Sequence, residues 1–248
     1  MQTVYSRSKA VIDPLASIDS EIVFNTRLYM KYFISSEVIR RKNIKHVLEL
    51  SCGNGFGLAV LSSGVHKITG IEHNTSLLQV AHDRKLHNAK LIKLDLNKND
   101  LAKYWKEKKF GRVGAVLKFN SRDLDSNAEA QLRHLRTMLP RNGIFITSFQ
   151  NSKYTKSENG SGRKNISKEL VSIKVLKNNF EQAGFKVVFY GQPLLTLLET
   201  RLKFAIPILE NIVFAQDSSF SKWARFIGFK SRFFSNFSKD VLVIAEKI

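Results

Sequence analysis

The chain has 248 residues, of which 43% are hydrophobic, and its 40 Lys and Arg outnumber its 21 Asp and Glu to give a net charge of +19. This length and hydrophobic content predict a globular protein, with one α/β domain or at most two small ones, and exclude a disordered polyelectrolyte. Cys52 is the only cysteine, which excludes an internal disulfide, and the sequence has no run of 18 apolar residues that would span a membrane. Because residues 1–14 also lack the apolar core of a signal peptide, we expect a cytoplasmic protein.

The positive charge has three interpretations. The cations could contact the phosphates of a nucleic acid, they could meet an anionic membrane or an acidic substrate, or they could form an ordinary solvated surface. The lysines are spread along the chain without a tight run of five or six, so the sequence leaves all three interpretations open.

Short apolar segments alternate with amphipathic ones along most of the chain. Residues 1–44 precede the first strand and are predicted to be helical, especially 25–42. The predicted strands then cover 45–50, 67–72, 89–95, 113–119, 144–149, 185–190 and 239–248, and the predicted helices cover 57–64, 74–87, a short segment at 101–105, 127–139 and 167–184. This alternation is typical of βαβ units and predicts a parallel sheet.

Two segments interrupt the alternation. Residues 151–165 form a polar loop that we expect to be mobile, and residues 191–238 separate the last two strands by far more than a normal connection. From Ser218 to Lys239 this insert holds seven aromatic and five basic residues and no acid. It could be a helical cap over the substrate side, a peripheral contact with a membrane surface, or a surface that stacks on nucleic acid bases.

Acidic residues stand at the ends of three consecutive predicted strands, where open parallel sheets bind their ligands. They are Glu49, Glu72 and Asp95, and a glycine turn at 53–57 follows the first. An acid in that turn would repel a pyrophosphate, so Glu49 argues against a dinucleotide and for a ligand with a cationic end. Glu72 is placed to accept hydrogen bonds from ribose hydroxyls, and Asp95 from the amine of a base. S-adenosylmethionine combines a cation, a ribose and an adenine, and has no phosphate.

The same segments resemble the motifs of class I S-adenosylmethionine-dependent methyltransferases. The resemblance rests on "VLELSCGNGFG" (47–57), "ITGIEHN" (68–74), "LIKLDL" (91–96) and "LRHLRTMLPRNGIFITSF" (132–149). It implies a Rossmann-like α/β fold with seven strands, six parallel and the last antiparallel, and helices on both faces of the sheet. The whole chain, 1–248, would be one domain, with an N-terminal helical cap (1–44), a core (45–190), a helical insert (191–238) and a final strand (239–248).

The resemblance also assigns roles to residues. Glu49 and the turn would hold the methionine part of the cofactor, Glu72 the ribose, and Asp95 with its neighbour the adenine. The cofactor-binding residues expected on this basis are Glu49, Ser51, Gly53, Asn54, Gly55, Glu72, His73, Asp95, Leu96, Phe119 and Tyr32. No metal is implied.

A narrower resemblance points to an acceptor. The segments "SFQNSKYTK" (148–156), "ISKEL" (166–170) and "FYGQ" (189–192) are similar to the type 11-like methyltransferases found with polysaccharide and glycosyl-transfer functions. That branch implies O-methylation of a sugar, a glycan or a glycolipid precursor. In it an N-terminal helical segment, here 31–33, closes over the cofactor.

The segment after the fourth strand departs from that branch. It reads "LKFNSRDLD" (117–125) and lacks the usual histidine, and Gly114 stands where an aspartate usually begins the strand. Asn120 and Asp123 are the remaining catalytic candidates, since an oxygen nucleophile usually needs help in losing its proton. Two alternatives stay open, an RNA methyltransferase that uses the basic surface and a non-catalytic binding module. The oligomeric state does not follow from the sequence.

Overall fold

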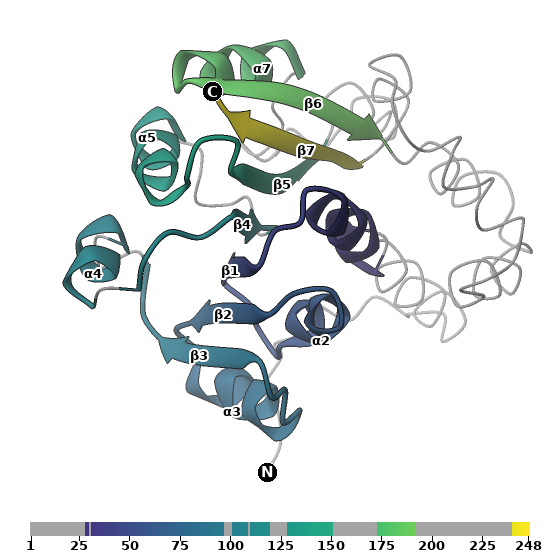
Figure 1. Cartoon of the computed structure of the whole chain (residues 1–248), viewed down its shortest axis with the longest axis vertical. Helices are drawn as coiled ribbons and strands as arrows, with labels where there is room; N and C mark the ends of the chain where they lie inside the picture. The colour runs from purple at the N-terminus through teal and green to yellow at the C-terminus, as the bar shows by residue number, and fades with distance from the viewer. Residues whose placement is uncertain are drawn as a thin grey trace, which may run out of the picture.

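Seven strands form one sheet in the part of the chain that the structure describes (Figure 1). In spatial order they are β3 (Ala89–Lys93), β2 (Lys67–Glu72), β1 (His46–Leu50), β4 (Ala115–Lys118), β5 (Ile144–Gln150), β7 (Asp240–Lys247) and β6 (Phe185–Gly191). The structure is a computed structural model that describes residues 28–29, 31–96, 101–108, 110–119, 128–150, 173–191 and 240–248.

The strand directions agree with the sequence. β1 pairs in parallel with β2 and β4, and β3 and β5 extend this parallel pairing on either side. β7 is antiparallel to both β5 and β6, which confirms six parallel strands and a last antiparallel one. The predicted third strand is two residues too long, because its pairing with β2 stops at Lys93, opposite the last residue of β2. The fourth is likewise shorter than predicted.

Helices cover both faces of the sheet, as expected. Residues 31–41 are helical and belong to the predicted N-terminal helix, and the labelled helices are α2 (Phe56–Ser62), α3 (Thr75–Asp83), α4 (Leu101–Glu107), α5 (Ala128–Met138) and α7 (Ile173–Gln182). The α2 helix and the 31–41 helix lie on one side of the sheet in Figure 1, and α4 and α5 lie on the other. None of the helices within the described ranges is long and apolar enough to cross a membrane.

The predicted helix at 74–87 ends early, at Asp83. Asn74 caps its start as predicted, because its Oδ1 accepts hydrogen bonds from the backbone N–H groups of Ser76 (2.9 Å) and Leu77 (3.2 Å). The helix cannot continue to residue 87, because Lys85 has a φ of 51°, in the left-handed region that no α-helix contains.

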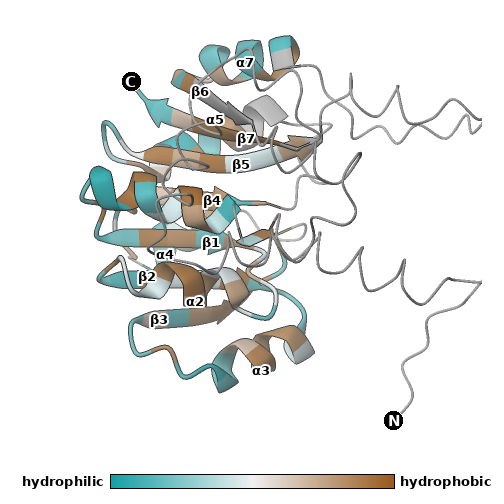
Figure 2. Ribbon diagram, turned by 90° about the vertical axis from the view of Figure 1, so that its right-hand side faces the viewer, coloured by the Kyte–Doolittle hydropathy of each residue, from teal (hydrophilic) through white to brown (hydrophobic). Residues whose placement is uncertain are grey.

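The alternation of side chains along each strand divides the core in two. One cluster lies against α4, α5 and α7 and contains Leu48, Val116, Phe145 and the predicted helix face of Leu132, Leu135 and Leu139. The other lies against α2 and the 31–41 helix and contains Val47, Leu58, Leu117 and Ile146. Figure 2 shows the hydrophobic strands between their helices.

The two ends of the strands matter for function. We call the side of the sheet where the parallel strands β1 to β6 end the carboxyl edge, and the side where they begin, and where the antiparallel β7 ends, the amino edge. In Figure 2 the carboxyl edge lies to the right. The predicted loop at 151–165 and nearly all of the predicted insert lie outside the described residues. The residues that flank the insert, Gly191 and Asp240, both lie at the carboxyl edge, because Gly191 pairs with Val241.

Candidate cofactor site

The glycine turn connects β1 to α2 at the carboxyl edge. Between β1 and α2, three residues have a left-handed backbone, with φ of 57° at Ser51 just before the turn, 56° at Gly53 and 74° at Gly55. A Cβ on Gly55 would lie only 2.9 Å from the Cβ of Ala81, so the turn packs tightly against α3. A Cβ on Gly53 would meet no atom of the described residues within 4 Å. The turn is therefore held from one side and open at Gly53.

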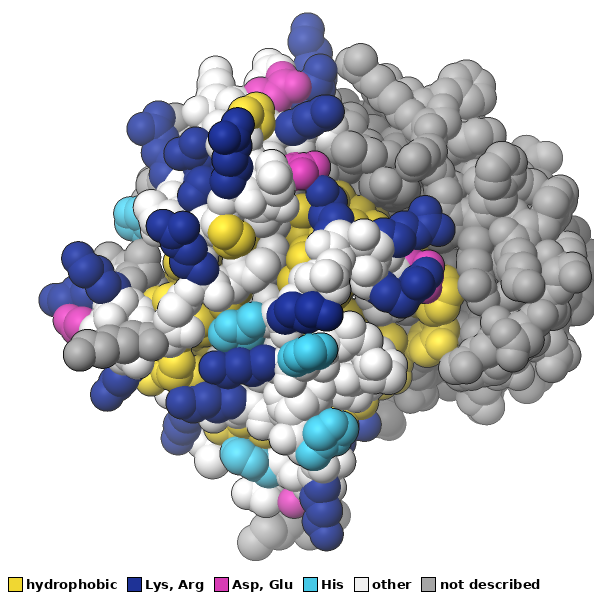
Figure 3. Space-filling model, in the orientation of Figure 1, with side chains coloured by type: hydrophobic (Ala, Val, Ile, Leu, Met, Phe, Trp, Pro, Cys, Tyr) yellow, Lys and Arg dark blue, Asp and Glu magenta, His cyan; other side chains and the backbone are white. Residues whose placement is uncertain are grey.

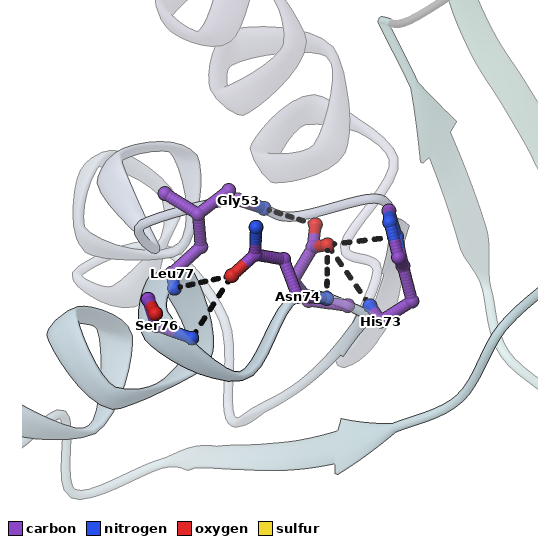
Figure 4. Close-up of polar contacts among 6 residues, drawn as sticks. Gly53, His73, Asn74, Ser76 and Leu77 are labelled. Carbon is purple, nitrogen blue, oxygen red and sulfur yellow. Dashed lines mark hydrogen bonds and ion pairs between the residues drawn. The ribbon is translucent and has the colours of Figure 1, made fainter. Parts of the chain in front are cut away.

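Glu72, the last residue of β2, joins the turn to this strand through hydrogen bonds, which Figure 4 draws at the labelled Gly53, His73 and Asn74. Its Oε2 accepts a hydrogen bond from the backbone N–H of Gly53 at 3.0 Å. Its Oε1 accepts from the backbone N–H groups of His73 and Asn74, both at 2.9 Å, and lies 3.0 Å from Nδ1 of His73. The Glu72 carboxylate is buried whereas the His73 ring is largely exposed. A carboxylate accepts about four hydrogen bonds, so Oε2, with Gly53 as its one donor among the described residues, keeps capacity for a further donor.

Glu49 is the second buried carboxylate, on the neighbouring strand β1. The Tyr32 hydroxyl donates a hydrogen bond to its Oε1. Its Oε2 is buried and has no hydrogen-bond partner among the described residues. Burial raises the pKa of Glu49 to about 8, although the bond from Tyr32 lowers it. A buried carboxylate with an unmatched oxygen is stabilised in its charged form by a cation.

Tyr32 brings the N-terminal helix against the turn. A Cβ on Gly57 would collide with the Tyr32 ring, so only glycine fits at that position of α2. The ring also meets Phe119, edge to face with centroids 4.8 Å apart, and Phe56 at 6.0 Å. Burial raises the pKa of Tyr32 well above its usual value, and the neighbouring Glu49 raises it further. Tyr32 thus packs against Phe56 and Phe119 beside the turn, and the closure of residues 31–33 over a cofactor stays a prediction.

Comparison with known proteins identifies solved structures with a similar fold. No protein-family model matches the sequence, and no curated protein matches it. Among solved structures, the plantazolicin methyltransferase BpumL in complex with SAH (S-adenosylhomocysteine) has a TM-score of 0.58 and 13% identity, covering 95% of this chain and 91% of that one. The magnesium protoporphyrin IX methyltransferase from Synechocystis PCC 6803, with bound SAH, has a TM-score of 0.57, 11% identity and coverage of 97% and 90%. The methyltransferase domain of bacterial CtHen1 has a TM-score of 0.52, 17% identity and coverage of 88% and 97%.

This chain has the class I methyltransferase fold. At these identities the likeness is one of fold, and it confirms the Rossmann-like sheet predicted from the motifs. The glycan-associated branch is not among these three relatives.

The methyltransferase fold brings most of the predicted cofactor residues to one end of the sheet. The segment after β3 comes beside Glu72, because the Leu94 N–H donates to the Glu72 carbonyl oxygen at 3.1 Å. Asp95 and Leu96 follow and are half-buried. Asn54 belongs to the turn, where its Oδ1 accepts from the Phe56 N–H at 3.1 Å. The assignment of these residues to a cofactor stays a prediction.

The two catalytic candidates, Asn120 and Asp123, lie outside the described residues. Cys52 is buried under the turn, and burial, with the nearby carboxylates, raises the pKa of its thiol to about 12. This thiol is therefore a packing residue rather than a nucleophile. Within the described ranges, no group of His, Cys, Asp and Glu could hold a metal ion.

The sequence reasoning missed a buried lysine. Lys118 is the last residue of β4 and is only 5% exposed, and its register partner Thr147 is fully buried. The Thr147 hydroxyl has no hydrogen-bond partner among the described residues. The signal was a single lysine at the end of the apolar run "GAVLKF", and it went unused because lysine is usually a surface residue.

Proposed function

We propose that this protein transfers a methyl group from S-adenosylmethionine to a hydroxyl of a sugar, glycan or glycolipid-type acceptor. The observation that best supports S-adenosylmethionine as the cofactor is the Glu49 carboxylate, which is buried beside the open glycine turn with one oxygen unmatched. Two relatives of the same fold were crystallised with SAH.

The residues present fit this cofactor. The unmatched Oε2 of Glu49 would receive the ammonium of the methionine part, which is a cation with N–H donors. The remaining capacity of Glu72 Oε2 suits a ribose hydroxyl, and the absence of a side chain at Gly53 leaves room for the ligand. When bound, S-adenosylmethionine supplies an electrophilic methyl carbon on a sulfonium. The protein binds and aligns the two reactants, which by itself supplies much of the rate.

The acceptor follows from the narrower resemblance. Segments 148–156, 166–170 and 189–192 are similar to glycan-associated methyltransferases, and a sugar hydroxyl must lose its proton as the methyl group arrives. We assign that proton to Asp123, with Asn120 as a hydrogen-bond partner of the acceptor. Both come directly after β4 in the sequence, which ends at the carboxyl edge.

The rival acceptor is RNA, because of the net charge of +19. In the described part of the chain, however, four of the six lysines within strands lie at the amino edge, away from the turn, and only Lys93 and Lys118 lie at the carboxyl edge. This arrangement does not favour RNA as the molecule that is methylated. A non-catalytic module is the second rival, because the fourth-strand segment lacks the histidine of the glycan branch.

Calorimetry tests the cofactor site. Glu49→Gln keeps an acceptor for Tyr32 but removes the charge, and a hydrogen bond to a charged group contributes roughly 1.5–3 kcal/mol. We expect the Kd for S-adenosylmethionine to rise about 10- to 100-fold. The control is Glu181→Gln, the same change on the outer side of α7, which should leave Kd unchanged. Failure of the wild-type protein to bind S-adenosylmethionine would overturn the proposal.

A transfer assay with labelled cofactor tests the acceptor. Pooled glycan, lipid and RNA fractions are offered separately, and label is expected in the glycan or glycolipid fraction. Label in RNA alone would replace the proposed acceptor. Binding of the cofactor without transfer to any fraction would instead support the non-catalytic module.

A further inference from the structure

Cations line the amino edge of the sheet, opposite the cofactor site. Each of the seven strands carries a Lys or Arg within three residues of its end at this edge. In spatial order from β3 to β6 these residues, here called the basic row, are Lys90, Lys67, Lys45, Arg112, Arg141, Lys247 and Lys186. All except Lys247 are exposed. Figure 3 views this edge and shows Lys and Arg side chains across it with few acids.

Acidic side chains do not balance the row. Within three residues of the same strand ends the acids are Glu246 and Glu49, and the Glu49 carboxylate is buried beside the turn at the opposite edge. The Oε1 of Glu246 already pairs with Nζ of Lys42 at 2.8 Å, and Lys42 is not part of the row. The row therefore keeps its net positive charge.

The cations lie close enough to repel one another. The pKa of Lys247 is lowered by burial and then by the charges of Arg136 and Arg112. The pKa of His46, the first residue of β1, is lowered to about 4 by burial and by the charge of Lys67. Lys247 is held in this position because its Nζ donates to the carbonyl oxygens of Arg136 (2.9 Å) and Leu139 (2.7 Å) at the end of α5. Like charges held together in this way favour an anionic partner.

We propose that the basic row binds the phosphodiester backbone of a double-helical nucleic acid. Neighbouring strands lie about 4.8 Å apart, so the five strands from β3 to β5 spread their cations over about 19 Å. One strand of a duplex presents a phosphate about every 3.4 Å, or roughly five to six over that length. The number of cations is close to the number of phosphates that one strand presents over this length.

The surroundings of the row favour a duplex over a membrane or an unpaired strand. Insertion into a lipid interface and stacking on free bases both need exposed aromatic or apolar side chains. Near this edge the rings of Trp105 and Phe110 are buried or half-buried, and the Phe110 ring is covered by Nζ of Lys90 at 4.5 Å. Ile248 is the one strongly exposed large hydrophobic residue within three residues of these strand ends in the described structure.

The row is a docking surface separate from the reaction. The glycine turn and the ends of β1 and β2 lie at the opposite edge of the sheet. Binding at the row therefore leaves the cofactor site free, and it does not depend on which acceptor is methylated.

Fluorescence anisotropy of labelled hairpin duplexes, one of RNA and one of DNA, tests the row with the full chain. About five phosphate contacts predict that the logarithm of the affinity falls with log salt at a slope of about −4 to −5. The variant Lys67→Glu/Arg141→Glu removes two contacts and should lower the affinity at 0.1 M salt on the order of 60-fold and reduce the slope by about 2. The control Lys174→Glu/Lys177→Glu makes the same charge change on α7, where it breaks only an exposed pair with Glu181, and should bind like the wild type.

Three results would overturn the proposal. They are no duplex binding by the wild type at low salt, equal losses in the row variant and the α7 control, and binding to vesicles of anionic lipid without binding to either duplex. S-adenosylmethionine binding, measured on the same samples, reports on folding and should be unchanged in both variants. A row variant that loses duplex binding but keeps cofactor binding supports the docking surface whatever the outcome of the transfer assay.

Discussion

Cofactor binding should depend on pH through Glu49. The pKa of its carboxyl group is about 8 in the free protein, and an ammonium bound at its unmatched oxygen would lower that pKa far below the working range. Binding then releases the proton of Glu49, so affinity rises with pH up to about 8. Above that pH the ammonium itself, with a pKa of about 7.7–8.0, loses its proton and affinity falls again.

The size of the effect follows from the two pKa values. Taking about 8 for Glu49 and about 7.8 for the ammonium, the affinity should rise about 8-fold from pH 6 to 7 and about 20-fold from pH 6 to 8. At pH 7 the complex should release about 0.8 protons, since the same two groups titrate on binding.

Isothermal titration calorimetry in two buffers of different ionisation enthalpy measures both quantities. In Glu49→Gln the rise between pH 6 and 7 should vanish, although binding is weaker at every pH. A rise that persists in this variant would assign the proton to another group and would refute the role given to Glu49. A flat wild-type profile would refute it as well.

Three further predictions use the same region. Tyr32→Phe removes the hydrogen bond that lowers the pKa of Glu49, so the rising limb of the affinity profile should move to higher pH in the same calorimetry. Because the folded pKa of Glu49 lies above its unfolded value, the free protein should lose stability as pH rises from about 4.5 to 8, and thermal melts of Glu49→Gln should show a smaller loss; equal losses would contradict the buried-acid assignment. Gly57→Ala forces a methyl group into the Tyr32 ring, so it should lower the free energy of unfolding by about 1–3 kcal/mol. Thermal melts should show a lower melting temperature, which Tyr32→Ala in the same chain should partly restore.

The parts of the fold that sequence predicted well are those with a local signal. The alternation of apolar segments fixed the strands, and the acids at the strand ends were recognisable because parallel strands end at one edge. The contact between Tyr32 and Glu49 had no such signal, because it joins residues 17 apart through packing on Gly57. The early end of α3 depends on the left-handed backbone of Lys85, and a lysine in the sequence does not predict that conformation.

The charge shows the same limit. The sequence shows isolated lysines and arginines, and nothing in their spacing distinguishes a solvated surface from a binding surface. Only the strand order brings Lys90, which precedes α4, and Lys186, which follows α7, onto one edge. The pattern that predicts the row is a cation at the start of each parallel strand and at the end of the antiparallel β7.

The pairing of β6 with β7 favours replacement of the segment that connects these two strands. Gly191 and Val241 pair in adjacent antiparallel strands, so the chain leaves and re-enters the sheet within about 5 Å. The ends of any segment spliced there are already held together, and doubling the length of a flexible connection adds only about 0.6 kcal/mol. Selection could therefore lengthen, shorten or replace residues 192–239 with little effect on the sheet, which makes this junction a place where enzymes of the same architecture could acquire different acceptors.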